Sequence, residues 1–227
     1  MIEKELENLL EMFEIKTSHP ELYFQAFTHA SYHNEHPESL DYDRLEYLGD
    51  SILDMVIADF LYHEYPQCDS GMLSKMRSVL VSGKMLTELS EKKYGFSKLV
   101  RYSKGERDNV RFHKHIDEDV FESFIGAVYV DQGYEKTRAV IYDVFSPYLK
   151  NAYYEAFRID AKGRLQELVK DTINYVKISE ENINTDDVSY LVEARYGDTV
   201  LGIGRGHNLK EAQTNAALDA LSKKVGD

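Results

Sequence analysis

The stretch from residue 43 to residue 51 decides the fold, and it reads Asp43-Arg44-Leu45-Glu46-Tyr47-Leu48-Gly49-Asp50-Ser51. Glu46 and Asp50 are four residues apart, and further along the chain Asp119 and Glu122 are three apart. Residues at these spacings share one face of a helix, so the carboxylates of each pair point the same way. Like charges so placed repel by roughly 0.2–0.5 kcal/mol. The spacing therefore predicts two helices with acidic faces that gain from a nearby cation.

Apolar residues recur at steps of three and four around both pairs, which supports the two helices. Each helix also carries an interior glycine, Gly49 or Gly126. Such a glycine costs about 1 kcal/mol relative to alanine, and close packing of the two helices would offset that cost. Two facing acidic pairs would form a cage of oxygen ligands, which Mg²⁺ or Mn²⁺ prefers. The alternative is two ordinary amphipathic helices with solvated acidic faces.

Length and composition set wide limits. A chain of 227 residues fits one large domain or two smaller ones. The single cysteine, Cys68, excludes an internal disulfide and suits a reducing compartment. The sequence shows no secretion signal and no apolar run near the ~20 residues of a membrane span. We therefore expect a cytoplasmic protein.

The charge is unusual for a nucleic-acid-binding protein. The net charge is −13, and the chain holds 17 basic and 27 acidic residues up to position 150, and 10 and 13 after it. Proteins that bind nucleic acids commonly show a basic footprint. The acidic balance predicts that any RNA binding is weak, because few phosphates are contacted. The most basic stretch, residues 101–115, leads directly into the acidic residues 117–119.

The chain changes character near residue 150. Before it, helical patterns run over residues 4–13, 21–28, 40–63, 71–94, 118–130 and 134–145, with Pro and Gly punctuation between them. After it, a helix over residues 160–170 precedes strand-like runs over 175–178, 189–196 and 199–205, and an alanine-rich helix over 210–224 closes the chain.

Three motifs resemble the ribonuclease III family. They are the signature at residues 43–53, the element Thr28-His29-Ala30-Ser31-Tyr32 and the second acidic motif at residues 119–129. Tyr42-Asp43 stands where the family commonly has Asn-Glu. The resemblance implies a mainly α chain that begins with an all-helical ribonuclease III endonuclease domain.

This resemblance also implies the chemistry. A ribonuclease III hydrolyses phosphodiester bonds in double-stranded RNA by a divalent-metal mechanism that leaves 5′-phosphate and 3′-hydroxyl ends. It implies Glu46, Asp119 and Glu122 as ligands of Mg²⁺, for which Mn²⁺ can substitute, and Asp50 and Glu122 as catalytic residues. Ribosomal RNA precursors, structured messenger RNA and transfer RNA are the implied substrates. The family is homodimeric, and Tyr47 holds the position of the aromatic residue that enters the partner.

The C-terminal part is similar to a double-stranded RNA-binding domain with the order α-β-β-β-α. Residues 162–167, with the pattern Lys-x-x-Leu-Gln-Glu, and residues 202–206, with the pattern Gly-x-Gly-Arg-Gly, carry the similarity. It implies RNA contacts by the side chains of Gln166, Glu167, Arg205, His207 and Lys210. Leu209 replaces one of the usual lysines, and acidic residues at 186–187 stand in the usual second contact loop.

Two functions remain open from the sequence, and the domain division is the same for both. We expect a catalytic domain over residues 1–152, a linker over 153–159 and an RNA-binding domain over 160–227. The first function is an endoribonuclease that cuts double-stranded RNA, which the full set of four carboxylates favours. The second is a double-stranded RNA-binding regulator that does not cut. For the C-terminal domain alone, a role in protein contact is a further alternative.

Overall fold

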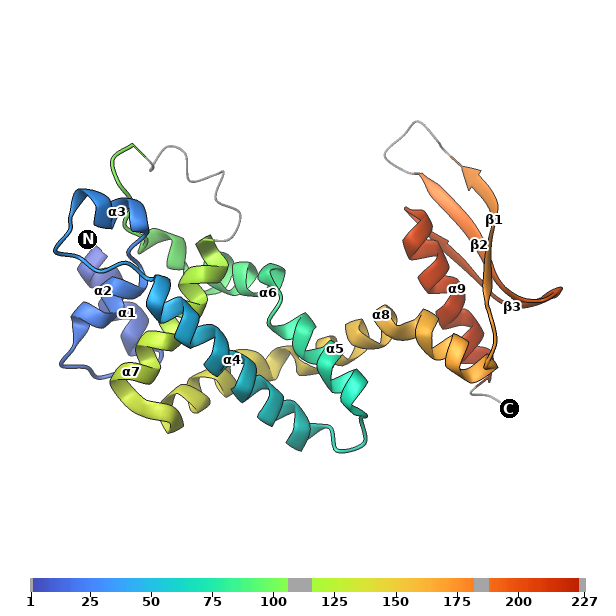
Figure 1. Cartoon of the computed structure of the whole chain (residues 1–227), viewed down its shortest axis with the longest axis horizontal. Helices are drawn as coiled ribbons and strands as arrows, with labels where there is room; N and C mark the ends of the chain where they lie inside the picture. Colours follow the sequence, from blue (N-terminus) through green and yellow to red (C-terminus); the bar gives the residue numbers. More distant parts are fainter. Residues whose placement is uncertain (1, 106–115, 182–187, 225–227) are drawn as a thin grey trace. The chain divides into compact units, whose positions relative to one another are not determined.

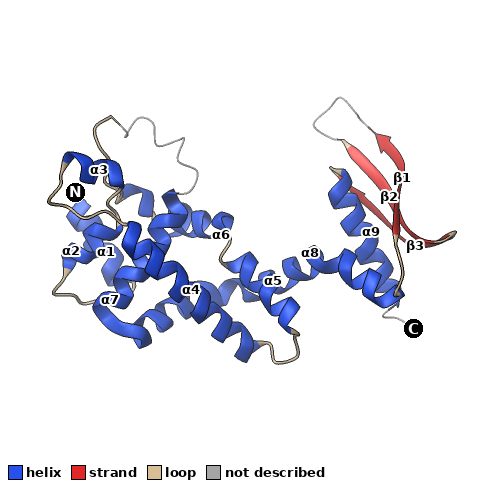
Figure 2. Cartoon of the chain, in the orientation of Figure 1, coloured by secondary structure: helices blue, strands red, loops and turns tan. Residues whose placement is uncertain are grey.

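The computed structural model describes residues 2–105, 116–181 and 188–224. The chain divides into two compact units, Met1–Ala152 and Tyr153–Asp227. The first unit is helical, and the strands of the chain lie in the second (Figures 1 and 2). This confirms the expected fold class, a helical domain followed by a small α+β domain.

The first unit is built from helices that short connections join. They are α1 (Ile2–Met12), α2 (Pro20–Ala26), α3 (Ala30–Glu35), α4 (Asp43–Glu64), α5 (Ser70–Leu80), α6 (Gly83–Thr87), the π-helix η1 (Glu88–Tyr94), the 3₁₀ helix η2 (Phe96–Lys98), α7 (Ile116–Phe145) and the 3₁₀ helix η4 (Ser146–Tyr148). Side-chain caps fix several starts, as at α5, where the Asp69 carboxylate accepts a hydrogen bond from the Met72 amide at 2.7 Å.

Helices α4 and α7 form the centre of this unit and pack against each other along much of their length (Figure 1). Their crossing is set by two glycines. A Cβ atom at Gly49 would lie 1.8 Å from the backbone oxygen of Glu122, and one at Gly126 would lie 2.2 Å from that of Leu45. Any larger residue would push the helices apart, which confirms the close approach predicted from the two glycines.

An aromatic cluster fills the core beside α7. The Phe124 ring is tilted against those of Phe13, Phe27 and Phe96 with ring centroids 5.2–6.2 Å apart, and Phe121 continues the cluster toward Phe145. Four of these rings are at most 1% exposed: Phe96, Phe121, Phe124 and Phe145. Burial of rings on one side of α7 leaves the acidic residues of the same helix on another face.

The second unit is a three-stranded antiparallel sheet with helices beside it. It contains β1 (Asn174–Glu181), β2 (Ser189–Tyr196), β3 (Thr199–Gly206) and α9 (Leu209–Lys224), with strand order β1-β2-β3. Gly202 and Gly204 lie on the inner face of β3, where added Cβ atoms would come within 2.4 Å of the α9 backbone. This close approach brings the alanines of α9 directly against the sheet: Ala212, Ala216, Ala217 and Ala220.

Several boundaries differ from the sequence prediction for local reasons. The single helix expected over residues 71–94 is divided, because Ser82 caps a new helix by accepting a hydrogen bond from the Met85 amide. Helix α7 joins two expected helices, and Gly133, with φ of 78°, breaks its regular geometry between them. Helix α8 (Leu149–Val169) includes residues 153–159, so the expected linker is helical. None of the described helices is long and apolar enough to cross a membrane.

Candidate functional site

The four predicted carboxylates lie at the crossing of α4 and α7. Glu46 and Asp50 lie near the start of α4, which begins at Asp43, and Asp119 and Glu122 lie near the start of α7, which begins at Ile116. The contact between Gly49 and the Glu122 backbone fixes the crossing at this level of both helices. The structure therefore brings together two acidic pairs that are separated by about 70 residues of chain.

The electrostatics of the crossing reflect this convergence. Partial burial raises the pKa of Glu122 to about 8, and the charges of Asp50 and Glu118 add to the shift. Burial likewise raises the pKa of Glu46 to about 7, with Asp119 as the next cause. The pKa of Asp50 is also raised, first by burial and then by Asp54. Without a counter-ion, the full negative charge of this cluster is therefore unfavourable.

The four carboxylates are close enough to repel one another, but they do not converge as the ligands of a bound metal ion would. Within residues 2–105, 116–181 and 188–224, no group of three or more His, Cys, Asp and Glu side chains converges on a point that could hold a metal ion. What the structure does bring together is the donor chemistry: carboxylate oxygens on two helices, in mutual electrostatic range.

Glu118 is a member of this cluster that sequence reasoning missed. Its charge raises the pKa of Glu46, Asp50 and Glu122. The carboxylate lies against Gly83 at the start of α6, where an added Cβ would be 2.4 Å from Glu118 Oε2. The acidic run at residues 117–119 was a visible signal, but only Asp119 of this run was predicted to belong to the site.

Tyr42 is the second residue whose role was missed. Its side chain is 5% exposed, and its hydroxyl donates a hydrogen bond to Asp119 Oδ2 at 3.2 Å. Burial raises the pKa of the Tyr42 phenol, and the charge of Asp119 raises it further, so the hydroxyl remains a donor. The departure from the family's usual asparagine at this position was the only sequence signal.

The serines next to the carboxylates are structural. Ser123 is fully buried, and its hydroxyl donates to the backbone oxygens of Ala26 and Val120 at 2.5 and 3.1 Å. The Ser51 hydroxyl donates to the Tyr47 backbone oxygen at 3.3 Å. Both hydroxyls therefore satisfy backbone acceptors of the helices, and no serine nucleophile is needed to explain their positions.

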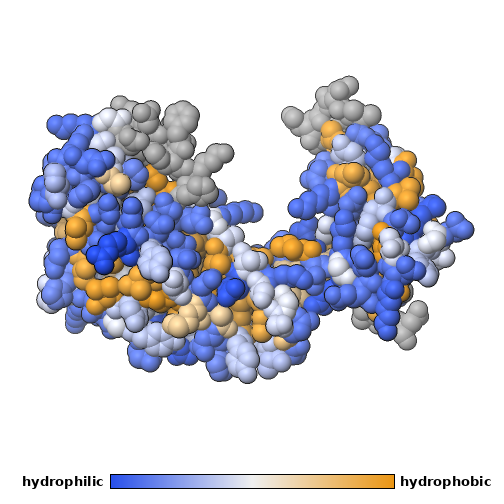
Figure 3. Space-filling view, viewed as in Figure 1, coloured by the Kyte–Doolittle hydropathy of each residue, from blue (hydrophilic) through white to orange (hydrophobic). Residues whose placement is uncertain are grey.

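The outer face of α4 carries exposed apolar side chains. Tyr47 is 79% exposed, Tyr62 67% and Met55 50%. In the space-filling view, hydrophobic residues gather in patches among hydrophilic ones on the visible face of this unit (Figure 3). The role of Tyr47 at a dimer interface stays a prediction, and its exposure leaves the ring accessible to a partner.

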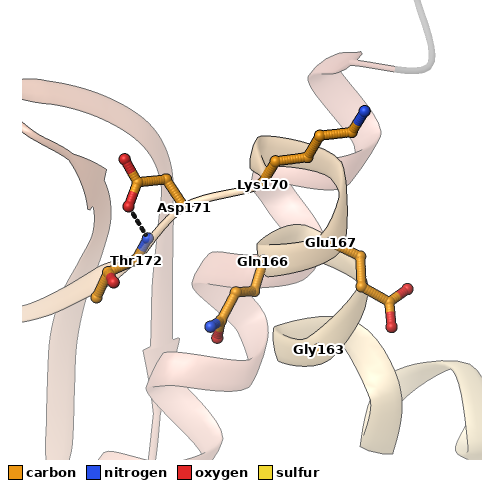
Figure 4. Close-up of a pocket in the computed structure, with 6 residues that line it drawn as sticks. All are labelled: Gly163, Gln166, Glu167, Lys170, Asp171 and Thr172. Atoms are coloured by element: carbon orange, nitrogen blue, oxygen red, sulfur yellow. Dashed lines mark hydrogen bonds between the residues drawn. The ribbon is translucent and has the colours of Figure 1, made fainter.

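The predicted RNA-binding residues lie on the surface of the second unit. Gln166 and Glu167 are exposed near the end of α8, where they line a shallow pocket with Gly163, Lys170, Asp171 and Thr172. Figure 4 shows the Gln166 and Glu167 side chains pointing to different sides of the helix. Their role in RNA binding stays a prediction.

Arg205, His207 and Lys210 are exposed around the start of α9. The Asn208 side chain accepts from the Glu211 amide at 2.9 Å, and the Glu211 carboxylate accepts from the His207 amide at 2.9 Å. This reciprocal cap satisfies amides at the helix start and fixes its direction. The acidic residues at 186–187, and residues 106–115 of the basic stretch, lie outside the described residues.

Comparison with known protein families agrees with this architecture. Residues 19–149 match the family model described as Ribonuclease-III-like, and residues 161–224 match the Double-stranded RNA binding motif. The two matches fall on the helical unit and on the α+β unit.

Curated relatives cover nearly the whole chain. A Ribonuclease 3 from Oenococcus oeni is 35% identical over 217 residues, which cover 92% of this chain and 93% of the relative. A Ribonuclease 3 from Listeria monocytogenes is 37% identical over 212 residues, covering 90% of this chain and 91% of the relative.

A solved structure agrees at the level of the first domain. The nuclease domain of ribonuclease III from Campylobacter jejuni superposes with a TM-score of 0.57 and 26% identity, covering 63% of this chain and 96% of that one. Motifs, two family models and relatives over more than nine-tenths of the chain thus agree. The chain belongs to the ribonuclease III family of double-strand-specific endoribonucleases, with a nuclease domain followed by a double-stranded RNA-binding domain.

Proposed function

We propose that this endoribonuclease hydrolyses double-stranded RNA with the help of Mg²⁺ held at the α4–α7 crossing, leaving 5′-phosphate and 3′-hydroxyl ends. The observation that carries the proposal is the convergence of carboxylates whose pKa values are raised by burial and by one another. Such a cluster is stabilised by a cation, and oxygen donors suit Mg²⁺, with Mn²⁺ as a substitute.

Three residues of the crossing suit the role of ligands: Glu46, Asp119 and Glu122. When bound, the divalent ion supplies charge neutralisation at the phosphate and makes an attacking water more acidic. Asp50 is exposed at the edge of the crossing, where its carboxylate can accept a hydrogen bond from water and orient it. Glu122 is the more buried group, and burial raises its pKa, so its negative charge becomes favourable only with a cation beside it.

Binding of the duplex is assigned to the second unit. Gln166, Glu167, Arg205, His207 and Lys210 lie exposed on it, and domains of this family read the shape of A-form RNA across its minor groove. We place the catalytic domain at residues 1–152 and the RNA-binding domain at 160–227. The helical segment 153–159 connects them.

Cleavage of both strands needs two active sites, which favours a symmetric homodimer. Tyr47, exposed on α4 beside the acidic cluster, is the proposed contact with the partner. The nuclease domain from C. jejuni shows structural flexibility in a region involved in its dimer formation. Maturation of ribosomal, messenger and transfer RNA in the cytoplasm is the cellular role that we propose from the family.

The test compares cleavage of a long, fully paired RNA by wild type, Glu122→Gln and Glu135→Gln, with Mg²⁺ and with EDTA. Glu135 is an exposed residue of the same helix with no place in the cluster, so it controls for the loss of one charge on α7. We expect Mg²⁺-dependent cutting by wild type and Glu135→Gln, and its loss in Glu122→Gln with duplex binding retained. Equal cutting by all three would refute the site. Binding without cutting by wild type would favour the non-cutting regulator.

A further inference from the structure

One hydrogen bond ties the start of α4 to the first turn of α7. The Tyr42 hydroxyl donates to Asp119 Oδ2 at 3.2 Å, across 77 residues of sequence. The Tyr42 backbone oxygen also accepts from the Glu46 amide at 2.9 Å. Tyr42 therefore contacts two of the three proposed ligand residues, one through its side chain and one through its backbone.

The position of Tyr42 is fixed by hydrogen bonds to Thr28, which Arg101 in turn holds in place. The Tyr42 amide donates to the Thr28 backbone oxygen at 2.9 Å, and Arg101 Nε donates to the Thr28 hydroxyl oxygen at 3.0 Å. The Arg101 amide donates to the Phe27 backbone oxygen at 2.8 Å, and its guanidinium lies over the Tyr32 ring. These hydrogen bonds fix the backbone that carries the Tyr42 phenol.

The hydroxyl is well suited to orient a carboxylate in an acidic cluster. A phenol is a neutral donor, so it adds no charge to a site that already contains several anions. A carboxylate surrounded by other carboxylates is pushed to turn away from them, and a fixed donor to one oxygen opposes that rotation. Partners of this kind behind metal ligands commonly change metal affinity by 10–100-fold when they are removed.

We propose that Tyr42 is a positioning residue that holds Asp119 in the orientation needed to bind the divalent ion. This inference rests on the proposed metal role of Asp119. It also gives a function to the Thr28 motif, which is linked to the site by the hydrogen bond from the Tyr42 amide to the Thr28 backbone oxygen.

The test measures Mn²⁺ binding to the metal-free full-length protein, by the electron paramagnetic resonance signal of unbound Mn²⁺. Tyr42→Phe removes only the hydroxyl. Tyr23→Phe is the matched control, because Tyr23 is fully buried and its hydroxyl donates to Asp131 Oδ2, also on α7, at 2.8 Å. Thermal unfolding of both variants is recorded without metal, so that loss of stability is separated from loss of affinity.

We expect Tyr42→Phe to bind Mn²⁺ about tenfold more weakly than wild type, while Tyr23→Phe binds it normally although both variants lose stability. Cleavage by Tyr42→Phe should recover as the Mg²⁺ concentration is raised. Unchanged Mn²⁺ affinity in Tyr42→Phe, or an equal loss in both variants, would overturn the positioning role. Asp119→Asn separates the two proposals: if it binds Mn²⁺ like wild type, the metal role of Asp119 fails and the inference fails with it.

Discussion

Replacement of Gly49 by alanine tests whether the helix crossing builds the site. The added Cβ would lie 1.8 Å from the Glu122 backbone oxygen and 2.9 Å from the Gly126 nitrogen. These are backbone atoms that cannot rotate away, so α4 and α7 must separate by roughly 1 Å. Overpacking of this kind costs up to about 3 kcal/mol, and alanine returns about 1 kcal/mol of helix propensity.

The expected net loss is about 2 kcal/mol, which for a unit of this size lowers Tm by about 4–8 °C. Because the displaced backbone belongs to Glu122, cleavage by the folded variant should fall on the order of 100-fold, as misplacement by 1 Å commonly does. Circular dichroism at 222 nm follows the unfolding of the helical unit, and cleavage of a long RNA duplex at saturating Mg²⁺ reports the activity.

Gly71→Ala is the control for the glycine substitution. Gly71 is an exposed residue of α5, and the nearest atom to its added Cβ is the side-chain oxygen of Asp69 at 3.2 Å. This variant should keep wild-type activity and a stability within about 1 kcal/mol of wild type. If Gly49→Ala is as stable and as active as Gly71→Ala, close approach of the helices does not build the site.

Three other predictions follow from charge and packing. In EDTA the stability of the helical unit should fall as pH rises from about 5 to 8, because the folded-state pKa values of Glu46 and Glu122, about 7 and 8, exceed the ordinary 4.5. Mg²⁺ should reduce that fall. Thermal melts at a series of pH values measure it, and rising stability with pH in EDTA would contradict the prediction. Gly204→Ala should destabilise the second unit by placing a Cβ 2.1 Å from the Ala216 nitrogen, and urea denaturation should show a loss of about 2 kcal/mol or more in that unit alone. Lys210→Ala should weaken binding to RNA duplexes of any sequence, measured by fluorescence anisotropy. The slope of log affinity against log salt concentration should fall by the amount expected for about one phosphate contact, and an unchanged slope would show that Lys210 does not contact the duplex.

Local pattern was sufficient to predict most elements and the acidic cluster. The strand Ser189–Tyr196 has the predicted bounds, and the two interior glycines predicted the helix contact that brings the carboxylates together. The break at Ser82 was missed because the apolar period continues through it, and only the cap shows that a new helix begins.

The contributions of Tyr42 and Glu118 could not be read from local pattern. The first depends on a hydrogen bond across 77 residues, and the second on which side chain lies over Gly83. Both are properties of the packed helices. Glu118 does stand four residues before Glu122, but that spacing does not show that its side chain lies over Gly83. The sequence signals were the acidic run at residues 117–119 and one departure from the usual family motif at Tyr42.

The glycines of β3 serve packing, while the residues between them in the Gly-x-Gly-Arg-Gly motif form exposed surface. Gly202 and Gly204 face α9 and cannot accept a side chain, whereas Ile203 and Arg205 alternate with them on the open side of the strand. Substitutions at the outward positions can therefore change the exposed surface of the unit while the inward ones keep it folded. For an engineer, this strand offers adjustable surface positions with little risk to the scaffold.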